Sequence, residues 1–186
     1  MGKNYMTLSE LYYSKPRHTD KGGAHDYINS YYEYEFGDKK HKPINFLEIG
    51  VCWGGSIEVW LEWFTNINLY GIDIVNQLKL DCKDAKIIIE DAYSEKTAST
   101  FENNFFDYII EDGLHTVEYQ TIAIKLWLSK LKKGGKLIIE DISSLESVSI
   151  LEKTAKDICD VSVKVFDLRE NKKRYDDIIF EITKNV

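Results

Sequence analysis

The chain has 186 residues, of which 44% are apolar and 30% are charged, and it carries a formal net charge of −7 at pH 7. This length suits one domain with one core, and the acidic balance excludes the basic footprint of a dedicated nucleic-acid-binding protein. Three widely spaced cysteines form no complete disulfide framework and no C-x-x-C metal pair. No apolar run is long enough to span a bilayer, so we expect a soluble, cytoplasmic protein without a membrane partner.

The N-terminal part of the chain predicts helices that precede the main domain. Helix-like patterns cover Leu8–Tyr13 and Asp26–Phe36, and a turn rich in lysine follows. We therefore expect a helical cap or lid at residues 1–43 and one domain at residues 44–186. The tyrosines of residues 27–34 are expected at a surface or cleft, as a lid or as an interface of a homo-oligomer.

From residue 44 onward, short apolar runs alternate with helix-like segments. The expected strands are Phe46–Val51, Leu69–Ile74, Lys86–Ile89, Tyr108–Ile110 and Lys136–Ile139. The expected helices are Ser56–Phe64, Glu95–Asn103, Glu118–Leu131 and Leu145–Asp160. Short apolar strands with helical crossovers are typical of a parallel sheet that is covered on both faces.

Two further apolar runs, Val161–Leu168 and Ile178–Ile182, close the chain. The segment between them is too short for a helical crossover, so an antiparallel pair is expected. The sequence thus predicts an α/β fold, a Rossmann-like three-layer sandwich. Its seven-stranded sheet is mostly parallel and ends in an antiparallel C-terminal hairpin.

A glycine-rich turn follows the first expected strand, within Asn45–Ser56. Gly50 and Gly54 allow the backbone to approach a ligand, and the next helix offers free N–H groups to an anion. Glu48 lies two residues before the turn and is placed to accept hydrogen bonds from a ligand ammonium. The alternative is an ordinary tight turn with Glu48 on a solvated strand end.

The next two strands also end in acids. Asp73 ends the second strand, where an acid can accept hydrogen bonds from both hydroxyls of a ribose. The alternative role for Asp73 is a helix N-cap. Asp91, followed by Ala92 and Tyr93, closes the third strand. Acids at three successive strand ends form a stronger pattern than any one of them.

A group of acids and a histidine follows strands four and five. Asp112 and His115 come after the fourth strand, and Glu140 and Asp141 after the fifth. Parallel strands end at the same edge, so these carboxylates are expected to converge, and oxygen ligands suit Mg²⁺. The ordinary pKa of a histidine suits proton abstraction near neutral pH. The alternative is that Asp112 caps a helix, that His115 is an ordinary surface histidine, and that Glu140 and Asp141 form a solvated strand end.

With these motifs, the core from about Phe46 to Ile142 resembles class I S-adenosylmethionine (SAM)-dependent O-methyltransferases. It is most similar to the metal-dependent branch that methylates sugar hydroxyls, the macrocin and mycinamicin O-methyltransferase type. The resemblance implies SAM and Mg²⁺ as cofactors and a small-molecule or sugar acceptor as substrate. The SAM-binding residues that it implies are Glu48, Gly50, Trp53, Gly54, Ser56, Asp73, Asp91, Ala92, Tyr93 and Asp112.

The same resemblance implies roles for the acidic group. An Asp-x-x-His motif in this branch supplies a metal ligand and a catalytic base, which match Asp112 and His115. An acidic pair after the fifth strand completes the metal site, which matches Glu140 and Asp141. We therefore expect Mg-assisted transfer of the SAM methyl group to a hydroxyl. The alternatives are a metal-independent small-molecule methyltransferase, an NAD(P)-dependent oxidoreductase and a non-catalytic SAM-binding protein.

An N-terminal segment adds to the resemblance. Residues 19–27 resemble a Thr-Asp-Lys-Gly…His-x-Tyr segment that closes over the cofactor in related methyltransferases. Lys21, His25 and Tyr27 are therefore further cofactor-binding candidates. The chain is short for this branch, and it lacks room for a large acceptor-binding insertion.

Overall fold

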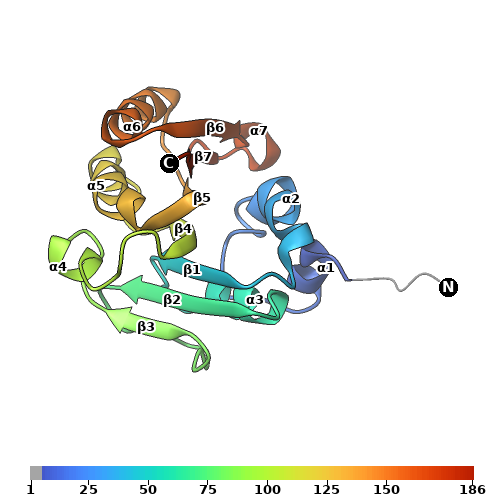
Figure 1. Cartoon of the computed structure of the whole chain (residues 1–186). Helices are drawn as coiled ribbons and strands as arrows, with labels where there is room; N and C mark the ends of the chain where they lie inside the picture. The colour runs from blue at the N-terminus through green and yellow to red at the C-terminus, as the bar shows by residue number, and fades with distance from the viewer. Residues whose placement is uncertain (1–5) are drawn as a thin grey trace.

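One seven-stranded sheet carries helices on both of its faces in the computed structural model, which describes residues 6–186 (Figure 1). The strand order is β3-β2-β1-β4-β5-β7-β6. The strands are β1 (Ile44–Ile49), β2 (Ile67–Asp73), β3 (Lys86–Ile89), β4 (Phe106–Glu111), β5 (Leu131–Ile139), β6 (Val161–Asp167) and β7 (Ile178–Lys184). Strands β1 to β5 pair in parallel, and β7 runs antiparallel to both β5 and β6. The predicted α/β sandwich and its antiparallel C-terminal pair are confirmed.

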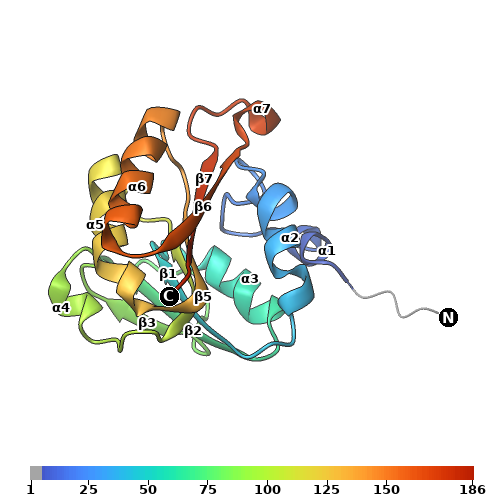
Figure 2. The same cartoon turned by 45° about the horizontal axis from the view of Figure 1, so that its top comes forward.

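Two layers of helices enclose the sheet. The helices are α1 (Leu8–Tyr13), α2 (Glu33–Phe36), α3 (Gly55–Trp63), α4 (Glu95–Ala98), α5 (Val117–Trp127), α6 (Leu145–Ile158) and α7 (Arg169–Lys172). A π-helical turn, Ile28–Tyr32, leads directly into α2, and short 3-10 turns follow α2 and α5. Figure 2 shows α1, α2 and α3 on one side of the sheet and α4, α5 and α6 on the other. No helix within residues 6–186 is long and apolar enough to cross a membrane.

Each face of the sheet contributes to its own apolar cluster. Successive residues of a strand point to opposite faces, so Phe46 of β1 packs with α3 while its neighbour Leu47 packs with α5. Strand β1 is buried at every position except the half-buried Asn45. This burial on both faces explains why the strand reads as a continuous apolar run rather than an alternating one.

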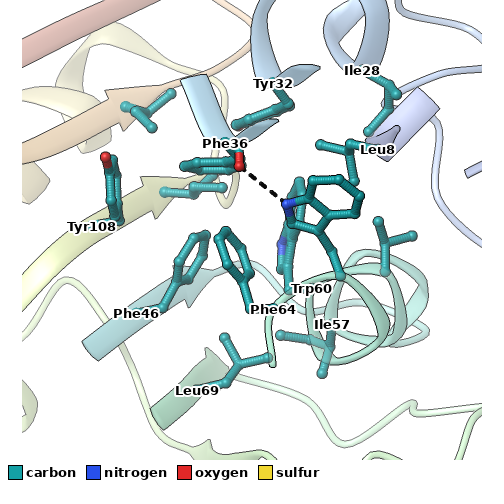
Figure 3. Packing of buried hydrophobic residues seen from close by; sticks show 14 of the residues in the cluster. Leu8, Ile28, Tyr32, Phe36, Phe46, Ile57, Trp60, Phe64, Leu69 and Tyr108 are labelled. Atoms are coloured by element: carbon teal, nitrogen blue, oxygen red, sulfur yellow. Dashed lines mark hydrogen bonds between the residues drawn. The ribbon is translucent and has the colours of Figure 1, made fainter. Parts of the chain in front are cut away.

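Aromatic rings fill the cluster beneath α2 and α3 (Figure 3). The Phe36 ring of α2 lies 5.5 Å from Trp60, 5.3 Å from Phe64 and 5.1 Å from Tyr108, measured between ring centroids. These contacts join α2, α3 and β4, so the described part of the predicted 1–43 cap packs directly on the sheet. Residues 1–5 of that prediction lie outside the described residues.

The tyrosines of residues 27–34 differ from the prediction. Tyr27, Tyr31 and Tyr32 are buried, whereas Tyr34 is 81% exposed. The expectation of a surface position is therefore wrong for three of the four. Tyr31 and Tyr32 are adjacent in the π-helical turn, and both reach the sheet: the Tyr31 ring packs on Phe166 of β6, and the Tyr32 hydroxyl bonds to Glu140 after β5.

Several element boundaries also differ, two of them by five residues. Helix α4 ends at Ala98 rather than Asn103, because the chain turns there and the Phe101 ring packs 5.8 Å from Trp127. Strand β5 begins at Leu131, five residues before the predicted start, and its register with β4 shifts in that added part.

Replacement of Phe36 by alanine tests the aromatic cluster. Phe36 is fully buried, so Phe36→Ala should lower the free energy of unfolding by about 3–5 kcal/mol. The matched control is Tyr34→Ala on the same helix, which should change it by only about 0.5 kcal/mol because Tyr34 is exposed. Urea denaturation measures both, and equal losses in the two variants would contradict this packing.

Candidate functional site

The residues that follow β1, β4 and β5 lie together at one edge of the sheet, which we call the carboxyl edge. The strand ladder continues to this point: Asp112 N donates to Ile49 O at 2.9 Å, and Glu140 N donates to Glu111 O at 3.0 Å. Parallel register therefore brings acids from distant parts of the sequence to one level. This is the juxtaposition that the sequence predicts.

The glycine turn at this edge packs against the protein's own chain. Gly50 has φ +87°, and a Cβ at this position would lie 1.9 Å from the carbonyl oxygen of Asp112. Gly54 has φ +88°, and a Cβ there would lie 2.8 Å from Cys82 Sγ. Both positions thus require glycine for conformation and for close approach of neighbouring segments.

Glu48 is fully buried at the end of β1, which excludes the alternative of a solvated strand end. Its Oε2 accepts a hydrogen bond of 2.7 Å from Trp60 Nε1. Its Oε1 is buried without a hydrogen-bond partner among the described residues. Burial raises the pKa of Glu48, although the ammonium of Lys21 opposes this effect. A buried carboxylate oxygen that accepts no hydrogen bond, and whose charged neighbour is Lys21 Nζ at 3.5 Å, fits a ligand ammonium.

Asp73 holds the glycine turn from the neighbouring strand. Its Oδ2 accepts hydrogen bonds from the backbone N–H groups of Val51 (3.0 Å) and Cys52 (2.8 Å). Asp73 therefore caps the turn rather than a helix. Its half-buried side chain still lies beside the turn, where the prediction places a ribose.

The other predicted cofactor residues surround the same turn. Trp53 is 40% exposed, and Lys79 Nζ lies 3.3 Å from the centroid of its indole. Ser56 is buried in the first turn of α3. Asp91 is exposed and caps the next turn, since its Oδ1 accepts a hydrogen bond from Tyr93 N at 2.8 Å.

Ala92 and Tyr93 connect the end of β3 with the end of β4. Ala92 is buried, and its carbonyl accepts a hydrogen bond from Trp127 Nε1 at 2.9 Å. The Tyr93 hydroxyl donates to Glu111 Oε1 at 2.5 Å and accepts from Leu114 N at 2.7 Å. Burial raises the pKa of Glu111 to about 7. This bonding fixes the loop that carries Asp112 and His115.

The ammonium of Lys21 lies at the centre of the carboxyl edge, with only 1% of the residue exposed. Its Nζ lies 2.6 Å from Asp112 Oδ2, 2.6 Å from Glu140 Oε2 and 3.5 Å from Glu48 Oε1. One cation from the N-terminal segment thus joins the ends of β1, β4 and β5. The Tyr32 hydroxyl donates to the other oxygen of Glu140.

The pKa shifts agree with an ionised Lys21. Burial alone would lower the pKa of Lys21, but the three carboxylates outweigh it and raise the pKa well above its usual value. Burial would raise the pKa of Asp112, yet Lys21 and His115 hold it below the usual value. For Glu140, burial dominates and raises the pKa, although Lys21 opposes the shift.

Asp112, His115 and Asp141 form a second group beside Lys21, which we call the cation cluster. His115 Nε2 lies 3.3 Å from Asp112 Oδ1, and His115 Nδ1 lies 3.2 Å from Asp141 Oδ2. One potential ligand atom from each residue lies within 4.8 Å of the others, which fits a divalent cation. Glu140, predicted as a metal ligand, has both oxygens engaged by Lys21 and Tyr32 instead.

The pKa of His115 differs from the ordinary value expected from the sequence. The hydrogen bond to Asp112 raises the pKa of His115 to about 9, and the charge of Asp141 adds to this effect. The His115 side chain is 41% exposed, so it is accessible from solvent while its two carboxylate partners are largely covered.

His25 and Tyr27 lie behind the cation cluster. The Tyr27 hydroxyl donates to Asp141 Oδ1 at 2.5 Å, and His25 Nδ1 bonds to Asp177 Oδ1. Sequence reasoning missed Asp177. The signal was available, because the antiparallel β7 begins at the edge where β5 ends, and Asp176-Asp177 directly precedes β7.

Comparisons with solved structures confirm the class of fold. The MycE methyltransferase of the mycinamycin biosynthetic pathway, in complex with Mg, SAH and mycinamycin VI, aligns with a TM-score of 0.74 at 21% identity. The alignment covers 99% of this chain and 56% of that chain. A fibrillarin pre-rRNA processing protein of Methanococcus jannaschii aligns at 0.64 and 16% identity, over 78% and 68% of the two chains. The fold is the Rossmann-like fold of class I SAM-dependent methyltransferases.

Curated relatives by sequence are sugar O-methyltransferases. The mycinamicin VI 2''-O-methyltransferase of Micromonospora griseorubida is 27% identical over 150 residues, covering 76% of this chain and 37% of that protein. The 8-demethyl-8-(2-methoxy-alpha-L-rhamnosyl)-tetracenomycin-C 3'-O-methyltransferase of Streptomyces olivaceus is 27% identical over 134 residues, covering 67% and 34%. The chain thus matches about a third of the length of these relatives. No protein-family model matches the chain.

Replacement of Lys21 by methionine tests its role as counter-charge. Lys21→Met leaves buried carboxylates uncompensated and should lower the free energy of unfolding by about 3–5 kcal/mol. Lys15→Met is the matched control, because Lys15 also contacts two glutamates but is 45% exposed, so it should lose about 1 kcal/mol or less. Chemical denaturation at pH 7 measures both, and a Lys21→Met loss as small as that of Lys15→Met would contradict the assignment.

Proposed function

We propose that this chain binds SAM and transfers its methyl group to a hydroxyl of a sugar-containing small molecule, with Mg²⁺ at the cation cluster. The observation that carries the proposal is the exposed His115 between Asp112 and Asp141, beside the glycine turn. The similarity to sugar O-methyltransferases supports the same reaction.

The glycine turn and its neighbours are the proposed SAM site. Glu48 Oε1, which accepts no hydrogen bond, is assigned to the ammonium of the methionine part, and Asp73 is assigned to the ribose. Gly50, Trp53, Gly54 and Ser56 line the turn, and Asp91, Ala92 and Tyr93 are assigned to the adenine end. Lys21 is assigned an indirect role, because its buried ammonium pairs with Glu48 and Asp112 and does not face solvent.

The proposed metal ligands are Asp112 and Asp141. Carboxylate oxygens are the ligands that Mg²⁺ prefers, and a Mg²⁺ bound here supplies Lewis acidity that lowers the pKa of an acceptor hydroxyl. Glu140 becomes a third ligand only if an oxygen is released by Lys21 or Tyr32.

His115 is the proposed base. Asp112 and Asp141 raise the pKa of its imidazole in the metal-free protein, so the ring holds a proton at neutral pH. A cation held by Asp112 and Asp141 would share the charge of these carboxylates and weaken their effect on His115, whose neutral ring would then accept the proton of the hydroxyl. The oxygen then attacks the sulfonium methyl, the carbon–sulfur bond breaks, and S-adenosylhomocysteine (SAH) leaves. The remaining contribution of the site is positioning and exclusion of water.

His115→Ala and removal of metal test this function. With SAM, Mg²⁺ and a panel of glycosides, His115→Ala should lose about 10²–10⁴-fold in turnover, measured as SAH release, while SAM affinity stays unchanged. The control is His41→Ala, because His41 is exposed and bonds to Thr65 ahead of β1 and β2, at the end of these strands opposite the carboxyl edge, so it should retain full turnover. EDTA should abolish wild-type turnover.

Three results would contradict parts of this account. Full turnover of His115→Ala would exclude His115 as the base. Full turnover of the wild type in EDTA would favour the metal-independent alternative. Binding of NAD⁺ in place of SAM, measured by calorimetry, would overturn the class of reaction.

A further inference from the structure

Asp141 is held from two sides. Its Oδ2 lies 3.2 Å from His115 Nδ1, whereas its Oδ1 accepts a hydrogen bond of 2.5 Å from the Tyr27 hydroxyl and lies 3.5 Å from His25 Nδ1. One oxygen therefore faces the cation cluster, and the other faces the N-terminal segment. Both oxygens of the carboxylate are therefore in contact, each with a different part of the chain.

The backbone of Asp141 adopts a conformation that needs support. Its φ is +55°, in the left-handed region that residues with a side chain adopt infrequently. The flanking residues are tied down, since Glu140 N donates to Glu111 O and Ile142 N donates to Ile178 O. Such strained positions persist where the surroundings define them fully.

A chain of buried side chains supports Asp141 from behind. The imidazole of His25 stacks on the Tyr27 ring, with 4.7 Å between ring centroids and 24° between planes. His25 Nδ1 bonds to Asp177, which is fully buried at the start of β7. The two arms of this chain therefore come from the N-terminal segment and from the C-terminal strand pair.

We propose that Tyr27, His25 and Asp177 are positioning residues that aim Asp141 at the cation cluster. The inference rests on the proposed function, because a cation at Asp112 and Asp141 is part of it. It differs from a direct contact of His25 and Tyr27 with SAM. The Tyr27 hydroxyl bonds to Asp141 and His25 Nδ1 bonds to Asp177, while His25 Nε2 lies 3.5 Å from Asp20 Oδ2. Outer residues that orient metal ligands typically affect metal affinity by about 10–100-fold.

The test measures Mn²⁺ affinity by calorimetry, with saturating SAH present. Tyr27→Phe removes a single hydroxyl, and Asp177→Asn removes the charge that holds His25. Each should weaken Mn²⁺ binding by about 10–100-fold. SAH affinity in EDTA should stay unchanged, because Tyr27 and Asp177 bond to Asp141 and His25 and lie outside the proposed SAM site.

Tyr31→Phe is the matched control. It also removes a buried hydroxyl that donates to a carboxylate, Glu181 Oε2 at 2.7 Å, but one that does not touch Asp141. Tyr31→Phe should leave Mn²⁺ affinity unchanged. The unfolding midpoints of Tyr27→Phe and Tyr31→Phe show whether lower stability alone explains a loss of Mn²⁺ affinity in Tyr27→Phe.

The outcomes separate the two claims. If the wild type binds Mn²⁺ and both Tyr27→Phe and Asp177→Asn bind it equally well, the positioning role is wrong and the proposed function stands. Weaker SAH binding by Tyr27→Phe in EDTA, with Mn²⁺ affinity unchanged, would overturn positioning in favour of a cofactor contact. A wild type that binds no Mn²⁺ would overturn both the metal site and this inference.

Discussion

The buried ion group around Lys21 is the interaction on which the rest of the carboxyl edge depends. Glu48, Asp112 and Glu140 end three parallel strands, and the sheet register forces them together. Buried carboxylates that lie this close to one another repel unless a cation or a proton lies among them. Lys21 supplies that cation from within the chain, so the edge can keep its acids before any ligand binds. Asp141 and one oxygen of Asp112 remain directed toward His115.

The N-terminal segment is therefore part of the site rather than an addition to it. Lys21, Tyr27 and Tyr32 each bond to an acid at the end of a strand, and His25 reaches the start of β7. The aromatic cluster beneath α2 and α3 holds the same segment against the sheet. Packing and charge at the carboxyl edge are coupled, because the residues that neutralise the edge also belong to the segment that covers one face of the sheet.

Much of this arrangement could be predicted from the sequence. The alternation of strands and helices predicts the sheet. Acids at successive strand ends predict an acidic carboxyl edge, since parallel strands end together. The role of Lys21 could not be predicted, because it depends on a contact with Asp112 that is 91 residues away in sequence. Burial of Tyr31 and Tyr32 also escaped prediction, because a regular helical period does not describe a π-helical turn. Asp177 was predictable in principle from the direction of β7.

The central claim is that the carboxyl edge holds SAM and a divalent cation side by side. A crystal structure with SAH and Mn²⁺, with anomalous data recorded at the manganese edge, tests it most directly. The account predicts an anomalous peak about 2 Å from carboxylate oxygens of Asp112 and Asp141, with SAH over the glycine turn. A peak only between His25, Asp176 and Asp177, or no peak with SAH bound, would contradict it.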